Sequence, residues 1–219
     1  MKLLRLSSRP LLALAAACVT FAACAASDYP NYSYFHAIEI DDGRGLADLL
    51  RRGADPNLRD DQGQVALFVA LRGNSLKAAK VLWEAPTLDV DARSPADETP
   101  LMMAALRGET EAAAALVARG AAVRKDGWTP LHYAATGGSV PIIRMLLDHG
   151  AELEARSPNG TTPLMMAAGY GSEEAVDALL AAGADRTVKN QRGWDAVEFA
   201  RASGRDFLVK RLQAAGLSH

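Results

Sequence analysis

The stretch WTPLHYAATGGSVPIIRMLLDHGAE, from Trp128 to Glu152, contains two short apolar segments separated by a pair of glycines. Thr129 followed by Pro130 is typical of a helix start, because threonine caps free amide groups and proline fits the first helical turn. The glycine pair ends this helix, and Gly150 supplies the left-handed residue that commonly ends a second one. The stretch therefore predicts a helix, a turn, a second helix and a tight loop.

Each predicted helix has one apolar face. Leu131, Ala134 and Ala135 fall at positions i, i+3 and i+4 of the first helix, and the two alanines allow a neighbouring helix to approach closely. Ile142 and Leu146 form a similar row on the second helix. Helices this short are marginal alone, since nucleation costs more than a few hydrogen bonds return. Such a unit needs neighbours.

The neighbours are repeats of the same pattern. They begin at Gln64 (QVALFVALRG), Glu98 (ETPLMMAALRG), Thr161 (TTPLMMAAGYG) and Trp194 (WDAVEFARASG). The first apolar anchors of the five units are Leu67, Leu101, Leu131, Leu164 and Val197, spaced by 34, 30, 33 and 33 residues. A sixth unit, from Ala37, has an abbreviated first helix. Regular spacing of this length indicates a repeat protein.

These motifs resemble the ankyrin-repeat family over residues 34–216, because the TPLHxAA core stands at 129–135 and GAD follows at Gly53 and Gly183. The resemblance implies an all-α ankyrin-repeat solenoid of about six helix-turn-helix units with short hairpin-like loops. Loop tips and first helices would then line a shallow concave groove. It also implies that His132 makes a structural hydrogen bond to Thr129 and the adjoining loop. Met102, Met165 and Phe68 replace this histidine in other repeats, where we expect no such bond across repeats.

Two loops depart from the regular length. The loop GAAVRKDGW before Thr129 lacks three residues, so we expect a short tip and a notch beside Trp128. The loop EAPTLDVDARSPADE has one extra residue, and Pro86 replaces the usual glycine, which predicts a bulge or kink. The charges at 51–52 and 124–125 are expected to be solvated, since cations favour helix ends and loops.

Residues 1–26 have the pattern of a secretory signal peptide, followed by a short linker at 27–33. The basic start is followed by an apolar stretch from Leu11 to about Ala23 and by small residues. Two cleavage sites remain open, one before Cys24 with lipidation of that cysteine, the other before Ala26. In both cases the mature chain keeps no free cysteine, which excludes disulfides, cysteine zinc sites and thiol catalysis.

The first prediction concerns this cleavage. We expect the mature N-terminus to lie between Cys24 and Ser27, because the basic, apolar and small-residue segments meet there. Mass spectrometry of the protein from its native envelope measures the terminus directly. A lipid-modified Cys24 would establish a lipoprotein, whereas an intact Met1 would contradict export.

Charge and motifs exclude several function classes. Loss of residues 1–26 takes the formal net charge from −2 to about −5 and leaves no basic patch for nucleic acid. The four histidines lack metal-ligand spacing, and no serine elbow or phosphate loop is present. The paired methionines at 102–103 and 165–166 suggest either core packing or a redox or metal site. We expect a non-enzymatic protein without a cofactor, with core packing at the methionines.

The register of the repeats predicts which residues face the groove. Arginine, tyrosine and tryptophan at such positions are typical of binding hot spots, although the two tryptophans could instead cover their own loops. The candidate partner-binding residues are Gln64, Arg72, Glu98, Arg107, Trp128, Thr136, Asn159, Tyr170, Arg192 and Trp194. Leu71 and Thr161 belong to the same predicted exposed row.

We therefore expect an exported, periplasmic and monomeric interaction module of the bacterial envelope. Its partner would be another envelope protein and not nucleic acid, and it would meet a membrane only through lipidation of Cys24. Two alternatives stay open. One is an envelope stress-protection component with redox or metal chemistry at the methionine pairs, and the other is an effector acting on a host protein.

Overall fold

The computed structural model describes residues 29–214, so the predicted signal peptide, Cys24 and the tail at 217–219 lie outside it. Within residues 29–214 the chain forms twelve α-helices and no strand. The helices are α1 (Tyr29–Glu39), α2 (Gly43–Arg51), α3 (Ala66–Arg72), α4 (Leu76–Glu84), α5 (Pro100–Arg107), α6 (Thr110–Ala118), α7 (Pro130–Gly137), α8 (Val140–Asp148), α9 (Pro163–Tyr170), α10 (Glu173–Ala181), α11 (Ala196–Ala202) and α12 (Asp206–Ala214). The expected all-α repeat architecture is confirmed.

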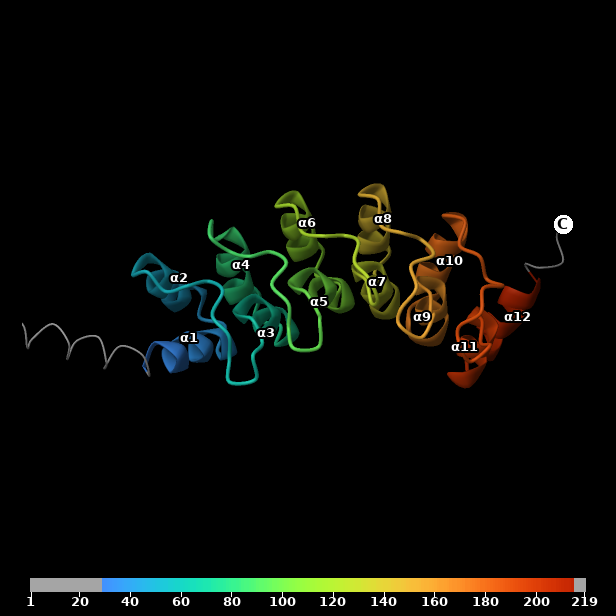
Figure 1. The fold of residues 1–219 in the computed structure, drawn as a ribbon, viewed down its shortest axis with the longest axis horizontal. Coiled ribbons are helices and arrows are strands. Elements are labelled where there is room, and N and C mark those ends of the chain that lie inside the picture. Colours follow the sequence, from blue (N-terminus) through green and yellow to red (C-terminus); the bar gives the residue numbers. More distant parts are fainter. Residues whose placement is uncertain (1–28, 215–219) are drawn as a thin grey trace, which may run out of the picture.

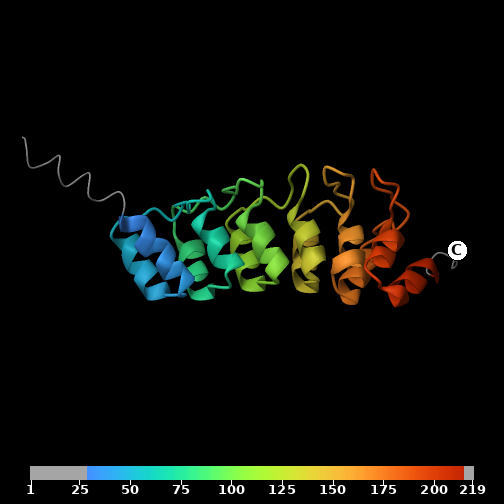
Figure 2. The same ribbon diagram turned by 90° about the horizontal axis from the view of Figure 1, so that it is seen from below.

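The helices are arranged as six antiparallel pairs stacked side by side in an elongated array. In Figure 1 the odd-numbered helices form one row, here called the inner row, and α2, α4, α6, α8 and α10 form the outer row. The long loops between pairs project to one side of the array (Figure 2). We call their tips the first to fifth fingers, residues 59–65, 93–99, 123–129, 156–162 and 189–195.

Tight packing in the inner row depends on small residues. The alanine pairs of α5, α7 and α9, at 104–105, 134–135 and 167–168, are fully buried. Gly137 at the end of α7 lies so close to α5 that a Cβ atom there would stand 2.3 Å from the carbonyl oxygen of Leu106. Any larger residue at 137 would push the two repeats apart.

The anchors predicted from the repeat period lie in the core. Leu67, Leu101, Leu131 and Leu164 are each no more than 1% exposed. Val197, the anchor of the last repeat, is only partly buried because α11 packs against α9 on one side and has no further inner helix on the other. Burial at the anchors therefore decreases at the end of the array, as nearest-neighbour stacking requires.

The first repeat differs from the prediction. Its first helix, α1, runs over eleven residues and begins at Tyr29, inside the segment expected to be a linker. It is therefore not abbreviated. Tyr34 and Ile38, one helical turn apart, are buried and give α1 its core face. The repeat lacks the Thr-Pro start that marks α5, α7 and α9, so no motif in the sequence indicated where α1 begins.

The loop after α4 is irregular, as Pro86 predicted. Helix α4 ends at Glu84 and is followed by Ala85 in an extended conformation, whereas left-handed glycines stand after four of the other outer helices. The carbonyl groups left open at this end accept hydrogen bonds from the guanidinium group of Arg119 in the next repeat, at Trp83, Ala85 and Pro86. The arginine thus replaces the missing helix cap.

Among the described residues, no helix has both the length and the apolar character that crossing a membrane requires.

Candidate functional site

The ten predicted partner-binding residues come from the fingers and from the inner helices. Arg72, Arg107, Thr136 and Tyr170 stand at or near the C-terminal ends of α3, α5, α7 and α9, and the other six lie in the fingers. Six are exposed, namely Arg72, Arg107, Asn159, Tyr170, Arg192 and Trp194. Gln64, Glu98, Trp128 and Thr136 are half-buried. We call these ten residues the candidate face.

The aromatic residues of the candidate face differ in how free they are. Tyr170 is 63% exposed, and no hydrogen bond or ring contact holds its side chain within the described residues. Trp128 packs edge-on against His132, with ring centroids 5.2 Å apart, and Trp194 packs edge-on against Phe199 at 5.9 Å. Each tryptophan therefore covers the start of its own inner helix. Trp194 still exposes 37% of its surface, so it can cover the start of α11 and also contact a partner.

The cations of the candidate face are largely unpaired. Within residues 29–214 neither Arg107 nor Arg192 takes part in an ion pair. Arg72 lies over the ring of Phe68, with 5.8 Å between the guanidinium carbon and the ring centroid. An unpaired guanidinium group on the surface can form two parallel hydrogen bonds to a carboxylate or an amide of another molecule.

Three further polar residues of the face form hydrogen bonds inside the protein. Glu98 accepts a hydrogen bond of 2.7 Å from the hydroxyl of Tyr133 in the next repeat, and burial together with this bond raises the pKa of Tyr133. The Asn159 side chain accepts a bond from the Thr161 amide, and the Thr136 hydroxyl donates to the His132 carbonyl. These side chains shape the face and offer fewer free groups to a partner.

Two residues predicted to be exposed are buried. Leu71 is 0% exposed because it follows the anchor Leu67 by four residues and shares its helix face. Thr161 is 1% exposed because its carbonyl group is drawn inward by His132 and by the Ser157 amide. The prediction was wrong by one position at Leu71, since Arg72 is the residue that matches Leu106 in the repeat register.

His132 has the structural role that the motif implied. Its Nε2 lies 2.9 Å from the Thr161 carbonyl oxygen of the next finger, and its Nδ1 lies 2.9 Å from the Thr129 hydroxyl. Because a carbonyl oxygen only accepts, Nε2 carries the proton and Nδ1 accepts from Thr129. Burial lowers the pKa of His132 to about 4, so the ring is neutral near pH 7.

This burial predicts a pH dependence of stability. The unfolded chain binds a proton at His132 near pH 6.5 and the folded chain only near pH 4, so stability falls as pH drops through this window. We expect the wild type to lose about 3 kcal/mol more between pH 7 and pH 4 than His132→Met, whose side chain occurs naturally at Met102 and Met165. Urea unfolding of both proteins at the two pH values measures the difference. Equal losses would contradict it.

The methionine pairs pack against the helices. Met102, Met103 and Met165 are at most 6% exposed, and Met166 packs against the same core. The sulfur atoms of Met102 and Met165 each lie 3.4 Å from a threonine amide at the start of their own helix. These thioethers thus take the local place of the His132 Nδ1 atom. Within the described part of the chain, no group of three His, Cys, Asp or Glu residues could hold a metal ion.

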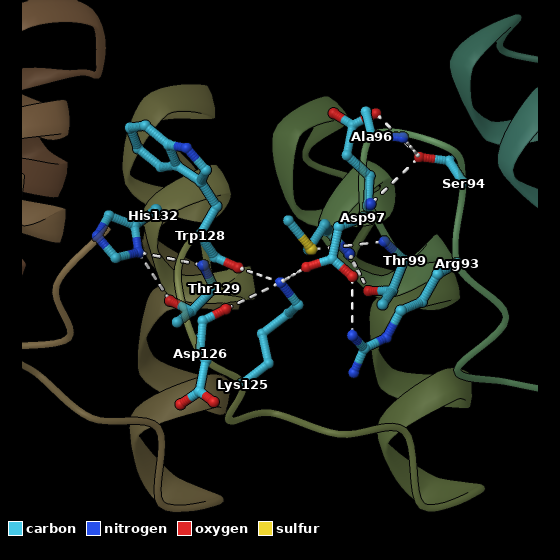
Figure 3. A network of polar contacts seen from close by, with 12 residues as sticks. Arg93, Ser94, Ala96, Asp97, Thr99, Lys125, Asp126, Trp128, Thr129 and His132 are labelled. Atoms are coloured by element: carbon cyan, nitrogen blue, oxygen red, sulfur yellow. Dashed lines mark hydrogen bonds and ion pairs between the residues drawn. The ribbon is translucent and has the colours of Figure 1, made fainter. Parts of the chain in front are cut away.

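The side chain of Lys125 is buried, contrary to prediction. Only 7% of its side chain is exposed, and its ammonium group lies 2.6 Å from a carboxylate oxygen of Asp97 in the second finger. It also donates to the carbonyl oxygens of Asp126, at 3.0 Å, and Trp128, at 3.1 Å (Figure 3). The sequence pattern showed a charge in a loop but not the acceptors, which include a residue 28 positions earlier. Its neighbour Arg124 is exposed, as expected.

The short loop predicted a notch beside Trp128, but the cavity in this region is not lined by that residue. A cavity of about 380 Å³ lies between the second and third fingers, lined by Arg93, Asp97, Val123, Arg124, Lys125, Asp126, Thr129 and Glu152. Trp128 does not line it, so the cavity is separate from the candidate face. Its wall carries three cationic and three anionic side chains, without an excess of either charge.

Comparison with known proteins identifies the family. A model of three ankyrin-repeat copies matches residues 35–122 and 87–157, and a model of many copies matches residues 148–200. The matches cover more than half of the chain, which therefore belongs to the ankyrin-repeat family.

Solved structures and a curated relative agree with this assignment. An ankyrin repeat domain from Acinetobacter baumannii (ABAYE2397) is 29% identical, has a TM-score of 0.69 and covers 84% of this chain and 98% of its own. A chain in the complex of the Bdellovibrio bacteriovorus predatory endopeptidase Bd0816 with immunity protein Bd3460 is 25% identical, with a TM-score of 0.70 and coverages of 83% and 97%. The human transient receptor potential cation channel subfamily A member 1 is 33% identical over 128 residues, 57% of this chain and 11% of the channel. The matched part of this chain spans between 7% and 30% of the length of each curated relative compared.

Ankyrin repeats typically bind other proteins and have no catalytic activity of their own. The endopeptidase complex shows that a chain similar to this one takes part in a protein complex.

Proposed function

We propose that this chain is a non-enzymatic interaction module of a bacterial cell envelope that binds a partner protein through the candidate face. The observation that carries the proposal is the combination of exposed Tyr170 with Arg107 and Arg192, two cations that no acidic residue of the described chain neutralises. Tyrosine and arginine are enriched at hot spots because they bury much area and pair specifically. The predicted signal peptide at 1–26 supports export, to the periplasm or to a membrane surface through Cys24.

The chemistry of the face favours a partner segment that carries carboxylate or amide groups beside apolar ones. Free guanidinium groups form charge-assisted hydrogen bonds to carboxylates, and a tyrosine ring offers apolar area with a polar end. The burial of Met102 and Met165 at helix starts supports a packing role for the methionines, so binding is the better proposal than redox or metal chemistry.

Affinity capture tests the proposal. The mature chain, residues 27–219, serves as bait for an envelope extract of the native organism, and mass spectrometry identifies what is retained. The expected result is one specific protein that also binds the purified chain by calorimetry with a defined stoichiometry. Calorimetric titration of the same chain with Cu⁺ tests the alternative of metal chemistry at the methionine pairs. Our proposal predicts no heat of copper binding. Copper binding without a protein partner would overturn the proposal.

A further inference from the structure

Four of the five fingers are closed by the same backbone hydrogen bond. In each of them a short polar residue stands five positions before the cap of the next inner helix, and its backbone amide donates to the carbonyl group of the residue before that cap. These bonds are Asp60 to Gln64, Ser94 to Glu98, Ser157 to Thr161 and Asn190 to Trp194, with lengths between 2.8 and 3.0 Å. The side chains of the same four residues also accept amide bonds within the finger.

The third finger lacks this hydrogen bond. Arg124 stands at the corresponding position, and within the described residues its amide makes no bond to the Trp128 carbonyl. The Lys125 ammonium group supplies the missing donor, 3.1 Å from that carbonyl oxygen. The third finger has seven residues like the others, so the expected short tip is absent, and a side chain here supplies the closing bond.

A second departure lies opposite, in the second finger. Asp97 has a φ of 61°, in the left-handed region, at the position where the other four fingers have glycine. A non-glycine residue in this region is strained, and such strain persists where the surroundings fix it. Here Asp97 binds both Lys125, at 2.6 Å, and Arg93, at 2.8 Å. Lys125 and Arg93 also lower the pKa of Asp97, which keeps the carboxylate charged.

We propose that Lys125 and Asp97 form a clamp between the second and third fingers, and that Lys125 is the positioning residue for Trp128. The clamp fixes the Trp128 backbone directly, through its carbonyl group, and fixes the spacing of the two fingers through Asp97. The importance of the clamp for binding rests on the function proposed above, since Trp128 belongs to the candidate face. The effect of the clamp on the position of Trp128 does not depend on that proposed function.

The chain provides a matched control. Lys80 forms an ion pair of 2.7 Å with Glu111, which also joins neighbouring repeats, but its side chain is 52% exposed and the pair lies between outer helices α4 and α6. Exposed pairs of this kind contribute little to stability. Lys80→Met therefore removes the same type of residue and bond without disturbing a finger.

The test uses 5-fluorotryptophan, which labels Trp83, Trp128 and Trp194 and gives three ¹⁹F resonances, assigned by single Trp→Phe replacements. We expect Lys125→Met to shift or broaden the Trp128 resonance and leave the other two in place. Asp97→Asn should move it in the same direction, and Lys125→Arg should restore part of the wild-type position. Lys80→Met should move none. No partner is needed, so the clamp is judged independently of the proposed function.

An unchanged Trp128 resonance in folded Lys125→Met would overturn the clamp, as would equal changes at all three tryptophans. If Lys125→Met does not fold, the Trp128 resonance of Asp97→Asn is judged by the same criterion. With a captured partner, Lys125→Met should weaken binding about tenfold by loosening a preorganised contact, with no further effect in a Trp128→Ala background. Full binding together with a shifted resonance would leave the clamp standing and contradict the role of Trp128 in the candidate face.

Discussion

Leu131→Ala is expected to lower the free energy of unfolding by about 2 to 5 kcal/mol. Leu131 is fully buried in α7, and α7 packs against both α5 and α9. Removing its side chain leaves a cavity at two interfaces between repeats, which tightly packed alanine helices cannot close by relaxing. Urea unfolding followed by circular dichroism measures the loss.

Truncation to alanine at the equivalent position of the last repeat provides the comparison. Val197→Ala should cost clearly less, because Val197 is only partly buried and α11 has an inner helix on one side only. In a stacked array, stability is approximately a sum of repeat and nearest-neighbour contributions. Equal losses at Leu131 and Val197 would contradict this architecture.

Combined replacement of Trp128 and Tyr170 by alanine is expected to remove partner binding while the protein stays folded. Truncation of a hot-spot residue commonly costs about 2 kcal/mol or more, roughly thirtyfold in affinity, and two such losses place binding below detection. The stability cost should be near 1 kcal/mol, because Tyr170 has no partner in the described structure and Trp128 loses one edge contact to His132. Calorimetric titration with the captured partner and a thermal melt of the same sample measure both quantities.

Phe207→Ala is the matched control for this experiment. Phe207 is 66% exposed, close to the 63% of Tyr170, but it lies on α12, the second helix of the last repeat. Its loss should leave affinity unchanged. A double variant that melts early would show that Trp128 mainly packs its own finger. A folded double variant with wild-type affinity would exclude these two residues from the binding surface.

Much of the fold could be predicted because it is local. Threonine-proline starts, glycine stops and apolar residues at three- and four-residue spacing each act within one or two turns, so repeats two to six were found from their own sequences. The first repeat lacks a Thr-Pro start, as do the second and sixth, and the buried pair Tyr34 and Ile38 is the signal that would have located α1. Leu71, predicted to be exposed, is buried because it lies one helical turn after Leu67 on the same face of α3.

The features that were missed involve contacts between neighbouring repeats. Lys125 and Asp97 are 28 residues apart, and a linear pattern does not reveal that their side chains form an ion pair. The bond between Tyr133 and Glu98, which joins residues 35 positions apart, was missed for the same reason. One signal was available, since Asp97 occupies a glycine position next to a loop that had lost three residues.

Site-specific photo-cross-linking tests the central claim most directly. Benzoylphenylalanine is placed at Tyr170, on the candidate face, or at Glu174, an exposed residue of outer helix α10, and each protein is irradiated with the captured partner. Binding through the candidate face predicts a cross-linked product from position 170 and none from position 174. A product from position 174 alone would show that the partner binds the outer helices, and would contradict the account.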